Sequence, residues 1–354
     1  MGRDRVGPVE PAVLAVDAGG SKADALLLDR TGAVLGKARR IGRSDVGRMR
    51  RSIDPLGEVV DAACREAGLS SDAGPVAAVG VYCLAGADFP IDERRIGRAL
   101  TRRAWTQRTV VRNDTFAILR AGTDRGWGVA VACGSGLNCL GIGPHGRVVR
   151  FPALGELSGD FAAGGEWVGI RALGSAIRAR DGRGARTSLE RLVPDHFGMA
   201  RPETVMNAIY LGRVSDDRLV ELPPVVFEAA TSGDAVAREI LDQLADEVVA
   251  MAAATIRRLR LAGQGVDAVL GGGVFRAEDP IFVGRIEEGI HAVAPAAKVV
   301  VLRTPPIVGA ALLGLDEIGA SSAASSKLRA SVDHATIGDA KDGMVPLDRP
   351  SEGV

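Results

Sequence analysis

The feature that most constrains the fold lies near the start of the chain, where two apolar runs flank a turn of small residues. Val13–Val16 and Ala25–Leu28 have the composition of buried strands. Asp17 directly follows the first run, so we expect its carboxylate at the end of a buried strand. The turn contains Gly19 and Gly20, which reach backbone angles closed to other residues and can bring their amides close to an anion.

This hairpin has two interpretations. In the first, it is a nucleotide-phosphate loop, in which the Asp17 carboxylate holds a hydrated divalent cation beside the bound anion. In the second, Gly19 and Gly20 form an ordinary hairpin turn with no ligand. The hairpin taken alone leaves both open.

The length and charge of the chain limit the classes of protein to consider. Its 354 residues predict about two domains with room for a sizeable core. Lys plus Arg and Asp plus Glu both number 44, so we expect no basic surface for nucleic acid or for a membrane. No apolar run approaches the roughly 20 residues of a membrane span, and the N-terminus lacks the apolar core of a signal peptide.

The cysteines indicate a reducing compartment. Cys64, Cys83, Cys133 and Cys139 contain no Cys-x-x-Cys pair and are too few for a disulfide framework in a chain of this length. We therefore expect a cytoplasmic protein. The four histidines lie far apart in the sequence and do not have the spacing of metal ligands.

Apolar periodicity and turn residues predict an α/β fold. After a three-stranded antiparallel meander, we expect strands at residues 76–83, 109–112, 127–132, 137–142, 266–270 and 298–302. We expect helices at residues 54–67, 91–105, 165–180, 188–197, 203–211, 224–231, 234–261, 279–292 and 307–318, with a short one from Thr115. From Ser321 onward, polar and small residues without periodicity predict an unordered tail.

The strand, glycine turn, strand pattern of the opening recurs in the middle of the chain. The second turn is Gly134-Ser135-Gly136, which lies between two predicted strands. A third glycine turn, Gly271–Gly273, follows a later strand. The recurrence predicts a weak internal duplication, with two related halves that face each other across a cleft.

These stretches resemble the sugar kinase, hsp70 and actin ATPase superfamily, and more closely the N-acetylglucosamine kinase and BadF/BadG/BcrA/BcrD ATPase family. The matching stretches cover about residues 13–315 and are AVDAGGSKADALLLDRTG, CLAGAD, VVRNDTFAIL, VACGSGLNCLGI, GELSGD, VLGGGV and PPIVGAALLG. The resemblance implies two ribonuclease H-like lobes of the actin-like ATPase type with a nucleotide cleft between them. It implies an N-terminal lobe of residues 11–115 plus 305–319 and a C-terminal lobe of residues 116–304, and the expected unordered tail is then residues 320–354.

The resemblance also implies ATP and Mg²⁺ as cofactors. The first glycine loop would bind the β- and γ-phosphates through backbone amides, with Asp17 orienting the magnesium ion and its waters. The second loop would hold the phosphates from the other lobe, and the third would lie against the nucleoside. Lys22 would neutralise phosphate charge, or it is a solvated lysine at a hairpin edge. The residues matching these loops are Gly19, Gly20, Ser21, Lys22, Gly134, Ser135, Gly136, Asn138, Gly271, Gly272 and Gly273.

Asp114 is the predicted general base. It lies at the end of a predicted strand, where the matching aspartate of the family accepts the proton of the attacking hydroxyl. The alternative is a helix N-cap, because Asn113-Asp114-Thr115 precedes a predicted helix. The residues matching the family's substrate contacts are Ser44, Asp45, Gly86, Ala87, Asn113 and Asp160. Gly86 and Ala87 have a simpler alternative role in strand-to-helix packing.

The acceptor side departs from the family pattern at two places. Asp45 stands where the resembling kinases have an asparagine that binds the sugar, and an ionised Asp only accepts hydrogen bonds. Gly159–Ala163 keeps the aspartate of the family's Gly-Asp-Glu-Gly-Ser run, as Asp160, and loses the rest. Recognition of an acetamido group therefore does not carry over, and an amino group or another hydroxyl pattern stays open.

We predict an ATP-dependent kinase that transfers the γ-phosphate to a hydroxyl of a hexose or amino sugar, resembling N-acetylglucosamine or glucosamine. We also expect a homodimer without nucleic-acid or membrane partners. One alternative is a kinase for a cyclitol or another sugar-like polyol. A second is an activator ATPase with a bridging iron–sulfur cluster, which needs paired, exposed cysteines. A third, a nucleotide-dependent sensor or repressor, is disfavoured by the neutral charge and by the absence of a DNA-binding segment before residue 13.

Overall fold

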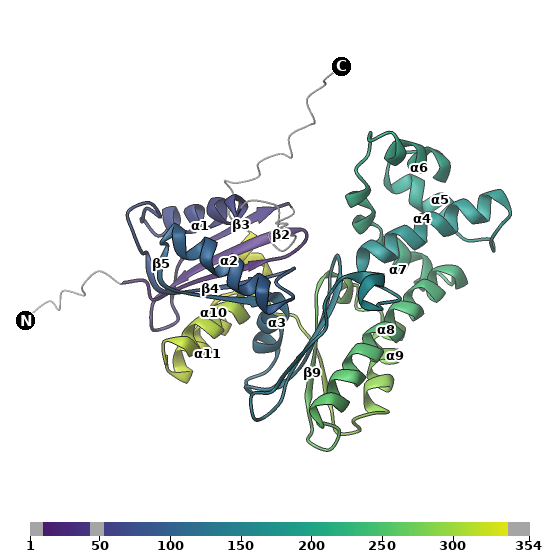
Figure 1. Cartoon of the computed structure of the whole chain (residues 1–354). Helices are drawn as coiled ribbons and strands as arrows, with labels where there is room; N and C mark the ends of the chain where they lie inside the picture. Colours follow the sequence, from purple (N-terminus) through teal and green to yellow (C-terminus); the bar gives the residue numbers. More distant parts are fainter. Residues whose placement is uncertain (1–9, 43–52, 339–354) are drawn as a thin grey trace, which may run out of the picture. The chain divides into compact units, whose positions relative to one another are not determined.

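The computed structural model describes residues 10–42 and 53–338, and its chain divides into two compact units (Figure 1). The first unit contains the residues up to Asp124 and those from Arg303 onward. The second unit is Arg125–Leu302. Each unit has its own five-stranded sheet and its own hydrophobic core.

The sheet of the first unit has the strand order β3-β2-β1-β4-β5. Its strands are β1 (Val13–Ala18), β2 (Lys22–Leu28), β3 (Val34–Ile41), β4 (Ala77–Leu84) and β5 (Thr106–Asn113). The predicted opening meander is confirmed, because β2 pairs antiparallel with both β1 and β3. In contrast, β1, β4 and β5 run parallel to one another, so their carboxyl ends lie at the same edge of the sheet.

Helices cover both faces of this sheet. They are α1 (Asp54–Glu66), α2 (Pro90–Arg103), α3 (Asp114–Gly122), α10 (Pro306–Glu317), α11 (Ser322–Ser331) and α12 (His334–Gly338). Side chains of β1 alternate between the two faces: Leu14 and Val16 join the core under α1 and α2, whereas Val13 and Ala15 join the core under α10 and α11. Burial on both faces explains why β1 reads as a continuous apolar run in the sequence.

The sheet of the second unit has the same topology as that of the first. Its order is β10-β9-β6-β7-β8, with β6–β7 and β7–β8 antiparallel and β6–β9 and β9–β10 parallel. The strands are β6 (Gly128–Cys133), β7 (Leu137–Ile142), β8 (Val148–Arg150), β9 (Asp267–Gly271) and β10 (Lys298–Val301). Five strands in the same order and directions agree with the predicted internal duplication.

The second unit adds a larger set of helices. They are α4 (Gly165–Asp181), α5 (Leu189–His196), α6 (Pro202–Tyr210), α7 (Pro223–Thr231), α8 (Ala235–Leu259) and α9 (Pro280–His291), with short 3₁₀ helices at Gly155–Ser158, Asp216–Glu221 and Gly273–Ala277. The long helix α8 contributes a stripe of buried side chains, including Ile240, Leu244 and Val248, at the spacing that the sequence predicted. In the part of the chain that the structure describes, no helix is both long and apolar enough to cross a membrane.

The structure differs from the expected domain limits at two places. Helix α3 belongs to the first unit, so the division falls after Asp124 rather than after residue 115. The reason is a close helix contact, since a Cβ atom at Gly309 of α10 would lie 1.8 Å from the carbonyl oxygen of Ala117 in α3. The expected tail also begins too early, because α11 and α12 are ordered helices whose Leu328 and Ile337 side chains are fully buried. Residues 339–354 lie outside the described residues.

Candidate functional site

The first glycine turn joins β1 to β2 and is held by main-chain hydrogen bonds. The Gly19 N–H donates to the Lys22 carbonyl at 2.9 Å, and the Gly42 N–H donates to the Ser21 carbonyl at 2.9 Å. A Cβ atom placed on Gly19 would meet no atom within 4 Å, so the turn borders open space. Because the Gly19 amide closes the turn, the amides of Gly20 and Ser21 are the better candidates for a phosphate contact.

Three aspartates lie at the carboxyl ends of neighbouring parallel strands in the first unit. Asp17 is the penultimate residue of β1, Asp88 follows β4, and Asp114 follows β5. Ligands of open α/β sheets bind at the carboxyl ends of the parallel strands. The topology therefore brings together three carboxylates that are up to 97 residues apart in the sequence.

Asp114 has the protonation behaviour of a base that works near neutral pH. Burial raises its pKa from 3.8 to about 7, and the Asp88 carboxylate adds to this effect. Hydrogen bonds from the backbone amides of Thr115 and of Asp114 itself lower the pKa in part. A carboxyl group with a pKa near 7 combines a usable fraction of the anion with a strong tendency to accept a proton.

The helix cap that was the alternative role for Asp114 is made by its neighbour. The Thr115 N–H donates to Asn113 Oδ1 at 3.0 Å, so Asn113 is the N-cap of α3. The other end of the Asn113 amide donates to Asp88 Oδ1 at 3.0 Å. Asn113 is buried and connects Asp88 to the start of α3, whereas its predicted contact with substrate stays a prediction.

Asp17 is buried beside the first glycine turn. Burial raises the pKa of Asp17 well above its usual value, and the carboxylates of Asp24 and Asp114 raise it further. Lys22 and Arg39 act in the opposite direction and lower the pKa. A buried carboxylate of this kind gains most from a cation placed next to it.

Asp24 lies directly opposite Asp17 in the β1–β2 register and forms a buried ion-pair network. Lys22 Nζ lies 2.8 Å from Asp24 Oδ2, and Arg39 binds both carboxylate oxygens, with Nε at 2.6 Å and Nη2 at 2.9 Å. The fork of Arg39 matches a carboxylate in two contacts. Lys22 is thus held by Asp24 rather than solvated, and its predicted contact with phosphate stays a prediction.

These residues fit magnesium that is brought in with a nucleotide. Mg²⁺ keeps several waters and is bound in nucleotide sites by one or two carboxylates together with phosphate oxygens. The described residues contain no group of three or more His, Cys, Asp or Glu side chains arranged to hold a metal ion. The buried Asp17 carboxylate therefore suits a shared Mg²⁺–phosphate site and not a preformed metal cage.

In the second unit, the two remaining glycine turns follow adjacent parallel strands. Gly134–Gly136 follows β6, and Gly271–Gly273 begins at the last residue of β9, with Ala132 paired to Gly271 in the register. Gly272 has a φ of +115°, and a Cβ atom there would lie 2.2 Å from the Cys133 carbonyl oxygen. Only glycine permits this approach, so the structure brings the second and third predicted loops together.

The start of α4 lies against the second loop. The Gly165 N–H donates to the Gly134 carbonyl at 2.8 Å, and the Glu166 N–H donates to the Ser135 carbonyl at 3.0 Å. Gly164, with a φ of +90°, approaches Gly136 so closely that a Cβ atom would lie 2.4 Å from its carbonyl carbon. The first amides of α4 therefore orient the second loop.

Asp160, the predicted acceptor of sugar hydroxyls, is buried in the second unit. Ser158 Oγ donates to Asp160 Oδ2 at 2.7 Å, and the Asp160 N–H donates to the Gly155 carbonyl at 3.1 Å. Glu247 of α8 lies close by, because it accepts a hydrogen bond from the Phe161 N–H at 3.2 Å. Burial raises the pKa of Glu247, and the Asp160 charge raises it further.

The remaining predicted residues have mixed outcomes. Ala87 is fully buried, which agrees with its packing alternative, and Gly86 makes a turn with a φ of +79°, whereas the substrate contact of this pair stays a prediction. Asn138 Oδ1 accepts a hydrogen bond from the Cys139 N–H at 2.7 Å. Ser44 and Asp45 lie outside the described residues. All four cysteines are buried, which does not suit the exposed cluster of an activator ATPase.

Several residues that the structure places at these sites have a weak signal in the sequence or none. Asp88 ends the quoted stretch CLAGAD, and its position after a buried strand was the available signal. Gly164 and Gly165 could have been found as paired glycines directly before a predicted helix. Glu247 and Asp24 gave no signal, because an acidic residue on a helix or strand is ordinary until its neighbours are known.

Comparisons with known proteins place the chain in a family. The model of the BadF/BadG/BcrA/BcrD ATPase family matches residues 14–314. An N-acetylmuramic acid/N-acetylglucosamine kinase of Clostridium acetobutylicum is 27% identical over 233 residues, which are 66% of this chain and 76% of that protein. An N-acetyl-D-glucosamine kinase of Dictyostelium discoideum is 27% identical over 210 residues, which are 58% of this chain and 65% of that protein.

A solved structure from Chromobacterium violaceum, described as a candidate N-acetylglucosamine kinase, has a TM-score of 0.68 and 24% identity to this chain. It covers 87% of this chain and 100% of its own. The likeness confirms the predicted fold class, with ribonuclease H-like units of the actin-like ATPase type. Since the family model spans the chain from β1 to α10, including all three glycine turns and Asp114, the chain belongs to the BadF/BadG/BcrA/BcrD ATPase family.

Proposed function

We propose that this protein is an ATP-dependent kinase that transfers the γ-phosphoryl group to a hydroxyl of a hexose or amino sugar. The observation that carries the proposal is Asp114, a carboxyl group with a pKa of about 7 at the carboxyl edge of the first sheet. The two curated relatives are named as kinases of acetamido sugars, which supports a sugar as the acceptor.

In the proposed reaction, Asp114 accepts the proton of the attacking hydroxyl. The hydroxyl oxygen forms a bond to the γ-phosphorus, and the bond between that phosphorus and the oxygen of the departing ADP breaks. Burial keeps the pKa of Asp114 high, Asp88 adds to this effect, and Asn113 holds Asp88 beside the start of α3. Asp114 must be ionised to act, so we expect activity to fall as the pH decreases below about 7.

The glycine turns are the proposed phosphate contacts. The amides of Gly20 and Ser21 would bind phosphate oxygens in the first unit, and Gly134–Gly136 would do so in the second. Gly271–Gly273 would lie flat against the nucleoside, where a side chain would obstruct the approach. Asp17 would hold Mg²⁺ through its waters, and the bound ion would neutralise charge on the phosphate oxygens.

The acceptor class is proposed more broadly than that of the relatives. Asp160, which is buried in the second unit, accepts a hydrogen bond from Ser158 Oγ, and such a carboxylate suits a sugar hydroxyl. Phe161 stands where the family has a glutamate, so the acetamido contact of the relatives is not assumed. The predicted contacts of Ser44 and Asp45, and the predicted homodimer, stay predictions. The buried, unpaired thiols suit a reducing compartment such as the cytoplasm.

The direct test measures ADP release in the presence of ATP, with and without Mg²⁺. The acceptors are hexoses, free amino sugars, N-acetylated sugars and cyclitols. We expect at least one sugar to stimulate ADP formation above the basal rate and to yield a phosphorylated product. If no acceptor in the panel does so, the proposed function is wrong.

The variant Asp114→Asn tests the base. We expect it to bind ATP and sugar with unchanged affinity and to lose about 10²–10⁴-fold in kcat, which is the usual contribution of a general base. Asp54→Asn is the matched control, because Asp54 is also the first residue of a helix in the same unit. Turnover of Asp114→Asn equal to that of the control would show that Asp114 is not the base.

A further inference from the structure

Helix α11 lies beyond the part of the chain that matches the family, which ends at residue 314. It packs on the first unit through Ala324 and Leu328, both of which are buried. Its backbone touches the turn between β2 and β3, since a Cβ atom at Gly32 would lie 2.2 Å from the Ala324 carbonyl oxygen. Lys327 Nζ also donates to Thr31 Oγ1 at 3.1 Å. These contacts attach α11 to the core of the first unit and to the turn between β2 and β3.

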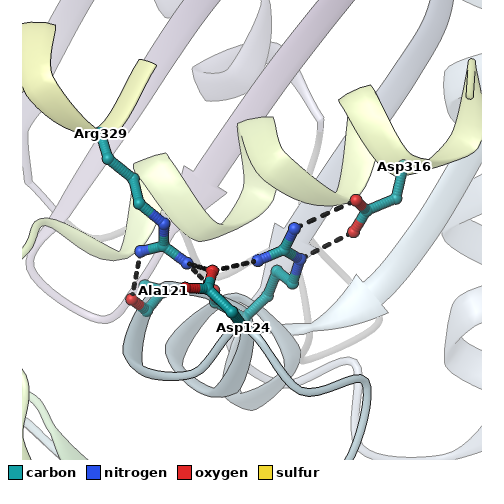
Figure 2. A network of polar contacts seen from close by, with 5 residues as sticks. Ala121, Asp124, Asp316 and Arg329 are labelled. Carbon is teal, nitrogen blue, oxygen red and sulfur yellow. Dashed lines mark hydrogen bonds and ion pairs between the residues drawn. The ribbon is translucent and has the colours of Figure 1, made fainter. Parts of the chain in front are cut away.

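Helix α11 also contacts the C-terminal end of α3, the helix that begins with Asp114 (Figure 2). Arg329 Nη1 donates to the Ala121 carbonyl at 2.6 Å, and Nη2 donates to the Arg120 carbonyl at 2.9 Å. Nη2 also lies 3.0 Å from Asp124 Oδ1. The last four carbonyls of a helix have no partner inside it, so a guanidinium at this end satisfies two of them and complements the helix dipole.

Helix α10 holds the same end of α3 from a second direction. Arg120 Nε and Nη2 donate to the two carboxylate oxygens of Asp316 at 2.7 and 3.1 Å. Arg120 Nη1 lies 3.4 Å from Asp124 Oδ1, so Asp124 is shared by the two arginines. Figure 2 shows Arg329 and Asp316 on either side of Asp124. Three helices are thus joined by one network at the end of α3 opposite to Asp114.

The length of α3 makes this end relevant to the position of Asp114. The helix has nine residues and touches α10 at its middle, where Gly309 approaches Ala117. With a rise of 1.5 Å per residue, Asp114 lies about 4.5 Å from this contact and Gly122 about 7.5 Å from it. A rotation of α3 about this contact that moves its C-terminal end by about 1 Å would therefore move its N-terminal end by about 0.6 Å in the opposite direction.

We propose that Arg329 is a positioning residue, which holds the C-terminal end of α3 so that Asp114, at the other end, stays aligned for the reaction. This inference rests on the proposed function. It gives α11 a role in the kinase site although no residue of α11 is part of that site. Catalytic groups work within about 0.5 Å of their best position, so the displacement of about 0.6 Å would lower the rate without removing substrate binding.

The test compares Arg329→Met with two other variants. Arg329→Lys keeps the cation at the helix end but loses the fork. Arg108→Met is the matched control, because Arg108 also binds a carboxylate and a carbonyl at the end of a helix. Its Nη1 donates to the Glu317 carboxylate at 2.5 Å, and its Nη2 donates to the Glu317 carbonyl at 3.0 Å, at the end of α10. All assays are made well below the unfolding temperature of each variant. Hydrogen exchange of the amides of residues 114–122 is measured by mass spectrometry alongside kcat and KM.

We expect kcat of Arg329→Met to fall about tenfold, with the KM values for ATP and sugar within twofold of wild type. Arg329→Lys should lose less, and Arg108→Met should keep its kcat. Exchange in residues 114–122 should increase in Arg329→Met and not in Arg108→Met. In the Asp114→Asn background, Arg329→Met should cause no further loss of kcat. The side chain at position 114 can then no longer act as a base, so its displacement does not lower the rate further.

An unchanged kcat in Arg329→Met, or a full additional loss in the Asp114→Asn background, would overturn the proposal. If Arg329→Met does not fold, Arg329→Lys carries the same comparison, and a kcat and exchange equal to wild type would overturn the proposal. A wild-type protein that no acceptor stimulates would instead refute the proposed function. In that case α3 amides that stay as protected as in wild type in both Arg329 variants would also overturn the positioning role. Increased exchange of these amides would show that Arg329 holds α3 in place.

Discussion

The raised pKa of Asp114 predicts a gain in stability when its charge is removed. In the folded protein the carboxyl group has a pKa of about 7, whereas the ordinary value of 3.8 applies to the unfolded chain. Between these two pH values the unfolded state loses a proton that the folded state retains. The free energy of unfolding therefore decreases as the pH rises from about 4 to about 7, and it is constant with respect to this group above that range.

The size of the effect follows from the two pKa values. At about 1.4 kcal/mol per pH unit, the interval from 3.8 to about 7 corresponds to about 4 kcal/mol at pH 8. At pH 5 the same calculation gives about 1.6 kcal/mol, so the cost grows by about 2.6 kcal/mol between pH 5 and pH 8. Asp114 is only half-buried, so water screens part of this cost and these figures are upper limits.

Urea unfolding of Asp114→Asn and wild type at pH 5 and pH 8 measures this difference. We expect Asp114→Asn to be more stable than wild type at pH 8 by about 1–4 kcal/mol, and the advantage to shrink by at least about 1 kcal/mol at pH 5. The control Asp54→Asn removes an exposed carboxyl group from the start of α1. An advantage of Asp114→Asn that is equal at both pH values, or that grows toward pH 5, would refute the reasoning. A stabilised but inactive variant is the expected signature of a strained functional group.

Two further predictions concern close approaches and buried charge. Gly272→Ala should destabilise the protein by about 1–3 kcal/mol in urea unfolding, because the φ of Gly272 is positive and the new Cβ would clash with the Cys133 carbonyl. Gly273→Ala is the control and should cost less, because its Cβ meets only the flexible end of the Arg276 side chain, 3.3 Å away. Asp24→Asn should cost about 3–5 kcal/mol, because it leaves Lys22 and Arg39 without their buried partner. The exposed pair of Asp246 with Arg285 is the control, and Asp246→Asn should cost no more than about 1 kcal/mol. Equal losses in either pair of variants would contradict these arguments.

Much of the fold could be predicted from short-range pattern. Apolar runs that are buried on both faces predicted β1, β4, β6 and β9, and the Gly134–Gly136 turn predicted the β6–β7 hairpin. Helix α1 begins at the Asp54-Pro55 pair, and helix α8 begins directly after its N-cap Asp234, as these residues predict. Such features depend on residues that are neighbours in the chain, so periodicity and turn chemistry are enough to find them.

The C-terminal region could not be predicted in this way. Ser322–Ser331 is polar and without clear periodicity, a pattern that predicts an unordered tail. It forms a helix because Leu328 is buried in a core that includes residues of β1, β2 and β4, more than 200 positions earlier, and because Arg329 binds the carbonyls at the end of α3. These partners lie far away in sequence, so no local pattern records them.

The same division applies to the candidate site. The sequence by itself determined the three glycine turns and the positions of Asp17 and Asp114 at strand ends, because a buried apolar run followed by a polar or glycine residue is a local signal. Only the tertiary structure decided which of these residues meet. The sheet buries Asp114, which raises its pKa to about 7, and the parallel pairing of β4 and β5 brings Asp88 close enough to add to this rise. A pKa depends on burial and on charges in space, and neither quantity exists until the sheet has formed.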